Sequence, residues 1–277
     1  GCGYRFLDAD RAVELIEHTL RQTRRPIFFG DDNFNARPAR TKAILEKVLE
    51  KGIRMPWWGA QVRVEAAQDR DLLALMKRAG CTKVYVGFES INQESLDLYN
   101  KSTSREKNED AIRRFHQAGL SIHGMFVLGF DDDDWPSVRK TVKFAMKSRL
   151  STTQFLILTP LPGSEFYQRM SSENRLRFRD WALYDAHHVV FEPARFSLFD
   201  LQKAQMYCHK KFYSWKQTAG KVLAGQWLSV GVAHYARKLN RTWTKRNRAF
   251  LKVVALLKSK TGARISVDYR EEVSLEL

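Results

Sequence analysis

The sequence contains little cysteine and no long apolar run, and each absence excludes a class of protein. Three cysteines among 277 residues, Cys2, Cys81 and Cys208, are far apart and odd in number, so they predict neither a disulfide framework nor a zinc knuckle. We therefore expect a reducing compartment, the cytoplasm. No apolar run reaches the roughly 18 residues of a membrane span, and no charged-then-apolar leader opens the chain.

Several catalytic and metal-binding motifs are also missing. The chain has no Gly-x-Ser-x-Gly elbow and no P-loop. His123, His187 and His188 lie in no His-x-His, Glu-x-x-His or Cys-x-x-Cys spacing, which favours structural or substrate-pocket histidines over metal ligands. A metal-dependent barrel hydrolase needs two or more histidines at strand ends, so the sequence disfavours that class.

Acidic residues are scarce in the last quarter of the chain. The formal net charge is +16, and residues 201–277 hold 16 Lys or Arg residues and four Asp or Glu residues, a net charge of +12. Trp and Tyr residues are interleaved with these cations. Such a pattern suits an anionic membrane surface, and RNA binding uses the same residue types. Ordinary solvated helices are the third interpretation.

What is present is a regular alternation of strand and helix patterns. Predicted strands start about 30 residues apart, the length of one strand–helix unit in a parallel barrel. They cover residues 26–30, 57–62, 83–88, 121–128 and 152–158. Helices are predicted over residues 8–21, 38–51, 69–79, 93–99, 105–118 and 134–149. Residues 164–200 show no clear period, and residues 200–258 look mostly helical.

Polar residues follow every predicted strand. Asp31, Asp32 and Asn33 come after the first, between Gly30 and Phe34. The other strand ends carry Gln61 and Arg63, Glu89 and Ser90, residues 129–134, and residues 159–164. Because the carboxyl ends of parallel strands meet at one edge, we expect a ring of functional groups around a barrel mouth.

Two of these strand ends have a second interpretation. Glu89 either reaches the barrel mouth or interacts with the N-terminus of the next helical segment. The four carboxylates of Asp131 to Asp134 are more typical of a solvated helix start than of a metal cage, since they precede Trp135 and Pro136.

Four of these segments together resemble the radical S-adenosylmethionine (radical SAM) superfamily, most closely its cobalamin-binding branch. They are residues 29–34, 87–90, 123–130 and 159–164, in this order and at strand–helix spacing. The resemblance implies an α/β fold, a partial (β/α)6 TIM-like barrel of the radical SAM type lacking its first strand, over residues 1–170. A substrate-side region (171–200) and a basic, mainly helical extension (201–277) would follow.

The resemblance also implies a cofactor site. Asp31 and Asp32, with Asn33, would hold the amino group of the methionine moiety of S-adenosylmethionine. Glu89 and Ser90 would lie on the ribose and methionine side, while adenine would be flanked by Gly129, Phe130, Thr159, Pro160 and Leu161. A carboxylate beside an ammonium group keeps both groups ionised and positions the ligand. No catalytic residue and no metal ligand is assigned.

The chain departs from the superfamily at its hallmark, a Cys-x3-Cys-x2-Cys loop that holds a [4Fe-4S] cluster. No such loop is present, and residues 2–6 look like the segment that follows it. We therefore expect the cluster ligands, the first strand and any cobalamin domain upstream of Gly1, and no radical chemistry from this chain alone.

Two functions remain open. The complete protein would cleave S-adenosylmethionine reductively for radical chemistry, of which cobalamin-dependent methyl transfer to a small-molecule or lipid-like substrate is one form. The alternative is a cluster-less binding or scaffold module that docks on a membrane or nucleic acid through its basic C-terminus.

Overall fold

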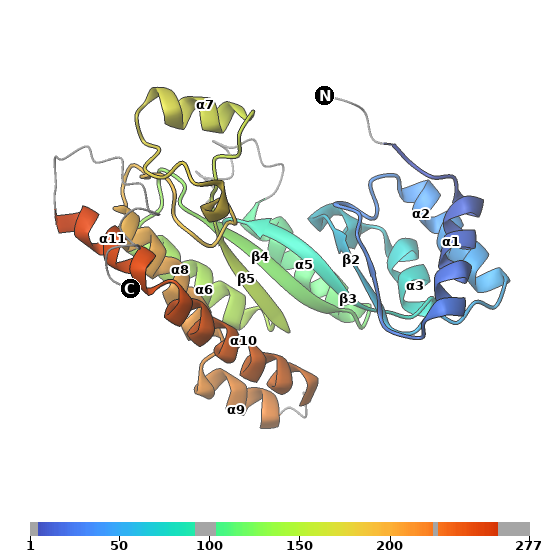
Figure 1. Cartoon of the computed structure of the whole chain (residues 1–277). Helices are drawn as coiled ribbons and strands as arrows, with labels where there is room; N and C mark the ends of the chain where they lie inside the picture. The colour runs from blue at the N-terminus through green and yellow to red at the C-terminus, as the bar shows by residue number, and fades with distance from the viewer. Residues whose placement is uncertain (1–4, 92–103, 224–226, 260–277) are drawn as a thin grey trace. The chain divides into compact units, whose positions relative to one another are not determined.

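The computed structural model describes residues 5–91, 104–223 and 227–259, and it divides into two compact units (Figure 1). The first unit comprises residues 1–88 and 103–124, and the second comprises residues 89–102 and 125–277. The helix predicted over residues 93–99 lies outside the described residues.

Five strands form one sheet in the order β1-β2-β3-β4-β5, which confirms the predicted α/β class with parallel strands. Because spatial order equals sequence order, each connection leads to the neighbouring strand, as in strand–helix barrels. Only the start of the third strand was predicted too late, since Cys81 is buried and pairs with Trp58. The strands are β1 (Ile27–Phe29), β2 (Trp58–Val62), β3 (Cys81–Glu89), β4 (Ser121–Leu128) and β5 (Thr152–Ile157).

Helices occupy the predicted positions between the strands. Several of their starts are capped by side chains that accept a backbone N–H, as Asp8 does from Arg11 and Asp69 from Leu72. Gly80 follows its helix with a positive φ of 92°, a conformation that favours glycine. These helices are α1 (Ala9–Gln22), α2 (Pro38–Glu50), α3 (Arg70–Arg78), α5 (Arg105–Gln117) and α6 (Trp135–Lys147), with a 3-10 turn, η1, at Val64–Gln68.

The first unit is built around Trp58. Its side chain is fully buried, and its indole Nε1 donates to the carbonyl of Ala79 over 2.7 Å, which satisfies the only polar atom of the ring. The rings of Phe29 and Phe34 pack against it at centroid distances of 5.1 and 5.6 Å. One buried aromatic side chain therefore joins the end of β1 to the start of β2.

The second unit contains one helix that the sequence pattern did not predict. Residues 164–200 were expected to be irregular, but α7 covers Glu165–Ser172, with the Ser164 side chain accepting the N–H of Tyr167 as its cap. At eight residues it is too short for its apolar period to be recognised. The expected helices beyond residue 200 are present: α8 (Leu198–Phe212), α9 (Trp215–Leu223), α10 (Trp227–Arg246) and α11 (Arg248–Ser259); a 3-10 turn, η2, covers Trp181–Leu183.

The outer edge of β5 is covered by α8 and the residue that follows it. The hydroxyl of Tyr213 accepts the N–H of Thr153 over 2.9 Å and donates to the carbonyl of the same residue over 2.7 Å. One turn earlier in the helix, His209 Nε2 lies 3.3 Å from the backbone N of Phe155 and 3.1 Å from its carbonyl oxygen. Two turns earlier, Gln205 Nε2 donates to the same carbonyl over 3.2 Å. The side chains of a helix thus replace a neighbouring strand, which protects an otherwise open sheet edge.

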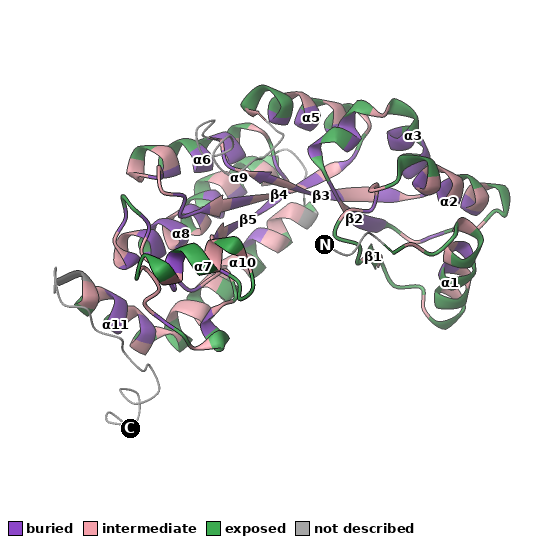
Figure 2. Ribbon diagram, turned by 90° about the horizontal axis from the view of Figure 1, so that it is seen from above, coloured by how far each residue is buried: buried purple, intermediate pink, exposed green. Residues whose placement is uncertain are grey.

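Burial alternates along the central strands (Figure 2). In β4, and in β3 from Val84 onward, every second residue is buried, whereas the residues between are half-buried. Successive side chains of a strand point to opposite faces, so one face of the sheet packs beneath helices and the other stays partly accessible. Among the described residues, none of the helices is both long and apolar enough to cross a bilayer.

The edge contact of Tyr213 yields a stability prediction. Replacing Tyr213 with Phe keeps the ring but removes both hydrogen bonds of its hydroxyl to the buried backbone of Thr153, so the free energy of unfolding in urea should fall by about 1–3 kcal/mol. Tyr235→Phe, on the exposed face of α10, is the matched control and should change it by less than about 0.5 kcal/mol. Equal values for the two variants would contradict a structural role for the hydroxyl.

Candidate functional site

The loop after β1 is held in place at Phe34, and its carboxylates lie just before this anchor. Phe34 packs on Phe29 at a centroid distance of 4.8 Å, and its N–H donates to the carbonyl of Gln61 over 2.8 Å. Its own carbonyl accepts the hydroxyl of Thr41 over 2.8 Å. The predicted site residues Asp31 and Asp32 are exposed, and Asn33 is half-buried beside them.

Two buried oxygens in this loop have no hydrogen-bond partner within the described part of the chain. They are the side-chain Oδ1 atoms of Asn33 and Asn35. An unpaired buried acceptor costs about 1–3 kcal/mol, so a ligand that brings donors would be stabilised here. Together with the nearby carboxylates, this loop fits a cationic or hydroxyl-bearing group.

Glu89 closes β3 in a strained conformation. Its φ of 61° is in the left-handed region, which costs a residue with a side chain roughly 1–2 kcal/mol relative to glycine. Glu89 is half-buried and Ser90 is buried. Strain of this kind is found most often at functional sites. The alternative contact of Glu89 with a helix over residues 93–99 lies outside the described residues.

The loop after β4 is organised by Asp133, which corrects its interpretation as part of a solvated helix start. Asp133 is only 4% exposed; its Oδ2 accepts the N–H groups of Gly129 (2.8 Å) and Phe130 (3.1 Å), and its Oδ1 accepts the hydroxyl of Ser137 (3.0 Å). Burial raises the pKa of Asp133 to about 6 despite these donors. Gly129 has a φ of 107°, and a Cβ there would lie 2.9 Å from Leu201 Cδ2.

The neighbouring acids also have structural partners. Asp134 accepts the N–H of Ser137 and caps α6, as the sequence indicated for this helix start. Asp131 pairs with the guanidinium of Arg175 and accepts the N–H of Ala194 over 3.0 Å. Burial would raise the pKa of Asp131, but Arg175 and Ala194 lower it overall. Within the described ranges, no group of three or more His, Cys, Asp or Glu side chains could hold a metal ion.

The end of β5 offers a hydroxyl and an apolar side chain. Thr159 Oγ1 donates to the carbonyl of Ile157 over 3.0 Å, Pro160 is buried, and Leu161 is exposed. The end of β5 also contacts a later segment of the chain. The N–H of Ile157 donates to the carbonyl of Ala186 over 2.7 Å. Ala186, with a φ of 60°, leads directly into the two adjacent histidines.

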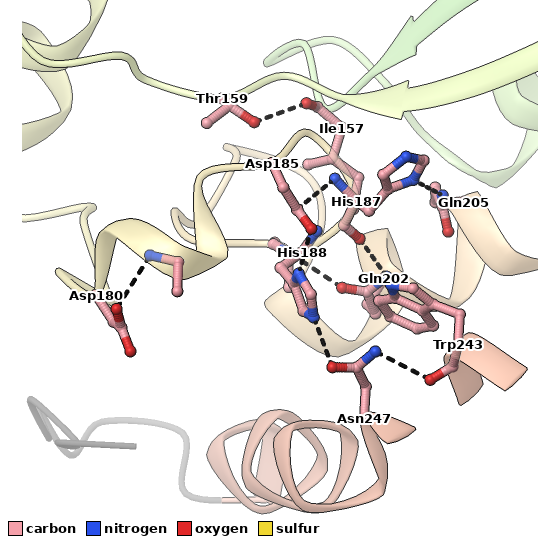
Figure 3. A network of polar contacts seen from close by, with 12 residues as sticks. Ile157, Thr159, Asp180, Asp185, His187, His188, Gln202, Gln205, Trp243 and Asn247 are labelled. Carbon is pink, nitrogen blue, oxygen red and sulfur yellow. Dashed lines mark hydrogen bonds and ion pairs between the residues drawn. The ribbon is translucent and has the colours of Figure 1, made fainter. Parts of the chain in front are cut away.

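His188 is held between Asp185 and Asn247 (Figure 3). Its Nδ1 lies 3.0 Å from Asp185 Oδ2, and its Nε2 lies 2.9 Å from Asn247 Oδ1. Asn247 Nδ2 donates to the carbonyl of Trp243, which fixes the orientation of this amide. Each ring nitrogen of His188 therefore has a polar partner, which fixes the orientation of the ring. Burial opposes ionisation of Asp185, but His188 and two backbone N–H groups lower its pKa to about 2.

His187 is held in its neutral form by a different set of contacts. Gln205 Nε2 donates to the carbonyl of Phe155 over 3.2 Å and lies 3.3 Å from His187 Nδ1, so this nitrogen is the acceptor and the proton is on Nε2. Burial also lowers the pKa of His187. Gln202 donates to the carbonyl of His187 and accepts the N–H of Val189. Both histidines are thus hydrogen-bonded within the second unit.

Three further candidates lie on the half-buried face of the sheet in the first unit. The rings of Tyr85 and His123 are 4.8 Å apart, and Lys83 precedes Tyr85 on the same face of β3. Burial lowers the pKa of Lys83 and raises that of Tyr85. From the sequence, His123 was considered only in relation to metal binding, and the site was expected at strand ends; the alternation of polar residues at positions 83 and 85 within β3 was the signal that could have identified this face.

Comparison with known proteins gives the family. The sequence model of the radical SAM superfamily matches residues 2–145. A bacteriochlorophyllide d C-12(1)-methyltransferase from Chlorobaculum tepidum is 31% identical over 248 residues, which cover 86% of this chain and 53% of that protein. The chain thus spans about half the length of this relative.

Solved structures show the same fold. The radical S-adenosylmethionine methyltransferase TsrM from Kitasatospora setae, with cobalamin and a [4Fe-4S] cluster bound, superposes with a TM-score of 0.54 at 19% identity over 60% of this chain and 32% of its own. The cobalamin-dependent S-adenosylmethionine radical enzyme OxsB superposes with a TM-score of 0.57 at 13% identity over 89% of this chain and 46% of its own. Both confirm the expected partial barrel.

Asp133 makes stability depend on pH. Its pKa is raised in the folded chain, so its protonated form stabilises the fold below about pH 4, and this contribution is lost as the pH rises through 6. Burial lowers the pKa of His209 to about 4, so between pH 4 and 6.5 this residue makes the fold more stable as the pH rises, which is the opposite of the effect of Asp133. The difference between wild type and Asp133→Asn isolates the carboxyl group and should change by about 2–3 kcal/mol across this window.

Urea unfolding at several pH values measures this difference. Asp71→Asn is the control, since the side chain of Asp71 is 90% exposed, and it should leave the pH dependence unchanged. A difference between wild type and Asp133→Asn that stays constant from pH 4 to 7 would rule out the raised pKa.

Proposed function

Because the chain belongs to the radical SAM superfamily, we propose that it forms the nucleoside-binding part of a cobalamin-dependent radical S-adenosylmethionine methyltransferase. The observation that supports this most strongly is the similarity to a bacteriochlorophyllide methyltransferase along 86% of the chain. The complete protein would cleave S-adenosylmethionine at a [4Fe-4S] cluster and transfer a methyl group.

The loop after β1 suits the amino acid part of S-adenosylmethionine. Asp31 and Asp32 supply negative charge for the ammonium group, and the unpaired oxygen of Asn33 supplies a further acceptor. These residues would hold the ammonium ionised and fix the orientation of the methionine moiety.

The second unit supplies groups suited to the nucleoside. The carboxylate of Glu89 and the hydroxyl of Ser90 match the ribose hydroxyls and the methionine side. Gly129 and Phe130 on one strand end, and Thr159, Pro160 and Leu161 on the next, would flank adenine with apolar surface and backbone groups. Asp133 would act through the two N–H groups that it orders, without touching the cofactor.

The two cysteines in the described part of the chain, Cys81 and Cys208, do not fit an iron–sulfur cluster. Burial raises the pKa of the Cys81 thiol to about 12 and also raises that of Cys208, whereas cluster ligands are thiolates. We propose that residues outside this chain supply the cluster ligands and that the chain alone performs no radical chemistry.

The substrate and a second partner can be proposed by class. The relative acts on a bacteriochlorophyllide, so we propose a small-molecule or lipid-like substrate for this protein. We also propose that the basic C-terminal extension, residues 201–277, contacts an anionic partner, because its net charge is +12.

Binding of two nucleosides tests the cofactor site. The double variant Asp31→Asn/Asp32→Asn should weaken binding of S-adenosylmethionine about 10- to 100-fold, because the ammonium loses its charged partners. Binding of 5′-methylthioadenosine, which lacks the amino acid moiety, should not change. Isothermal titration of the full chain measures both, with Asp71→Asn as control. Equal losses for the two ligands, or none for either, would refute the assignment.

Iron content tests the cluster assignment separately. Anaerobic reconstitution of this 277-residue chain with iron and sulfide should yield no brown absorbance at roughly 400 nm and no stoichiometric iron, because the chain has no three-cysteine loop. Stoichiometric iron and sulfide bound to the chain would show that the cluster ligands are internal.

A further inference from the structure

The C-terminal extension contains a helical hairpin with an apolar end and no acidic residue. Helices α9 and α10 pack against each other (Figure 1), and α9 ends at Leu223 shortly before α10 begins at Trp227. Leu223 is 90% exposed and Trp227 is 67% exposed. Single exposed apolar side chains are common, but here two large ones lie at the adjoining ends of two packed helices.

The charge along these two helices has one sign. Between Asp200 and Asp268 the sequence contains fifteen Lys and Arg residues and no Asp or Glu. The stretch 222–236 contains none of these four residue types, so the cations lie further along each helix. Lys216 precedes Leu223 by two helical turns, and Lys238 and Arg241 follow Trp227 by about three and four turns, so each cation shares a helix face with the apolar side chain of its own helix. Lys216, Lys238 and Arg241 are exposed. Burial and the neighbouring charge of Arg241 lower the pKa of Arg237, as expected where cations are not balanced.

The hairpin is attached firmly to the second unit. The guanidinium of Arg237 stacks on the Trp215 ring at 3.8 Å and donates to the carbonyl of Tyr213 and the hydroxyl of Thr218. Lys221 donates to the carbonyl of Ser151 at the start of β5. The exposed end therefore belongs to a braced element, and its apolar side chains are not covered by another part of the described chain.

We propose that the exposed side of this hairpin, with Leu223 and Trp227 at its end and the cations Lys216, Lys238 and Arg241 further along the same helix faces, is a docking surface for an anionic lipid membrane. An amphipathic element that lies on a bilayer inserts Trp and Leu at the headgroup boundary and places Lys and Arg against anionic headgroups. The cations can reach the headgroups while their aliphatic stems cover apolar surface. Such a surface would hold the protein where a lipid-like substrate is concentrated.

The exposed side chain of Leu223 favours a membrane over a nucleic acid as the partner. Aromatic rings stack on bases, and cations bind phosphates, but an exposed leucine has no role in either contact. Insertion into a bilayer uses Trp227 and Leu223 together with the cations on the same helix faces. The inference rests on the proposed anionic partner of the extension and is independent of the cofactor site.

Flotation of the full chain with vesicles tests the surface. The chain should float with phosphatidylcholine vesicles that contain roughly 30% phosphatidylglycerol and not with pure phosphatidylcholine. Leu223→Ser/Trp227→Ser should weaken this binding at least about tenfold, because two inserted side chains are lost. Lys216→Gln, Lys238→Gln and Arg241→Gln should weaken it about fivefold for each cation.

Control variants distinguish insertion of this surface from nonspecific adhesion and from misfolding. Trp57→Ser removes a Trp of 57% exposure in the first unit and should leave vesicle binding unchanged. All variants should keep the wild-type Tm and bind S-adenosylmethionine as before, so failure here is distinguishable from failure of the cofactor site. Four results would each overturn the proposal. Two concern the vesicles: equal flotation with neutral vesicles, and unchanged flotation of the Leu223/Trp227 variant. The other two point to a different partner: retention on RNA at matched salt without flotation, and a dimer that the variant abolishes.

Discussion

The pairing of α8 with the outer edge of β5 is the interaction on which most of the second unit depends. The edge of a parallel sheet presents N–H and carbonyl groups that must be satisfied if the edge is to be buried. Gln205, His209 and Tyr213 are spaced by four residues, so they lie on one face of the helix and meet the alternate residues Thr153 and Phe155. This match of helical and strand periods fixes the helix along the strand.

The same helix, α8, also positions the residues of the candidate site. Leu201 of α8 occupies the space that a Cβ on Gly129 would need, which holds the backbone after β4 close to the helix. Gln202 and Gln205 order the segment around His187. A change in the position of α8 would therefore move the end of β4, the end of β5 and the histidine segment together.

The features that suggest ligand binding are those that cost stability. Glu89 has a left-handed backbone conformation, Asn33 has a buried oxygen without a partner in the described part of the chain, and Asp133 is a buried carboxyl group. Each is destabilising by itself, by an amount on the order of 1–3 kcal/mol. The first two lie at strand ends of a parallel sheet, where a ligand would compensate the cost.

The sequence predicted the order of strands and helices well, because the periods of β3, α2 and α6 are regular and their caps, such as Asp134, are local signals. It also identified the strand ends as the candidate site. It missed α7, which is too short to show a period. It interpreted Asp133 as solvated because the donors that surround it, such as the N–H of Gly129, become apparent only when the loop is folded.

Long-range contacts account for the remaining difference between the predicted and the observed structure. They also connect the basic C-terminal extension to the candidate site. His188 follows His187 directly, yet its two partners come from Asp185 and from Asn247, 59 residues later. The imidazole of His188, between a carboxylate and an amide, joins the segment after the core to the junction of α10 and α11. The basic helices are therefore an integral part of the second unit, because one of the two partners that hold His188 beside β5 comes from them.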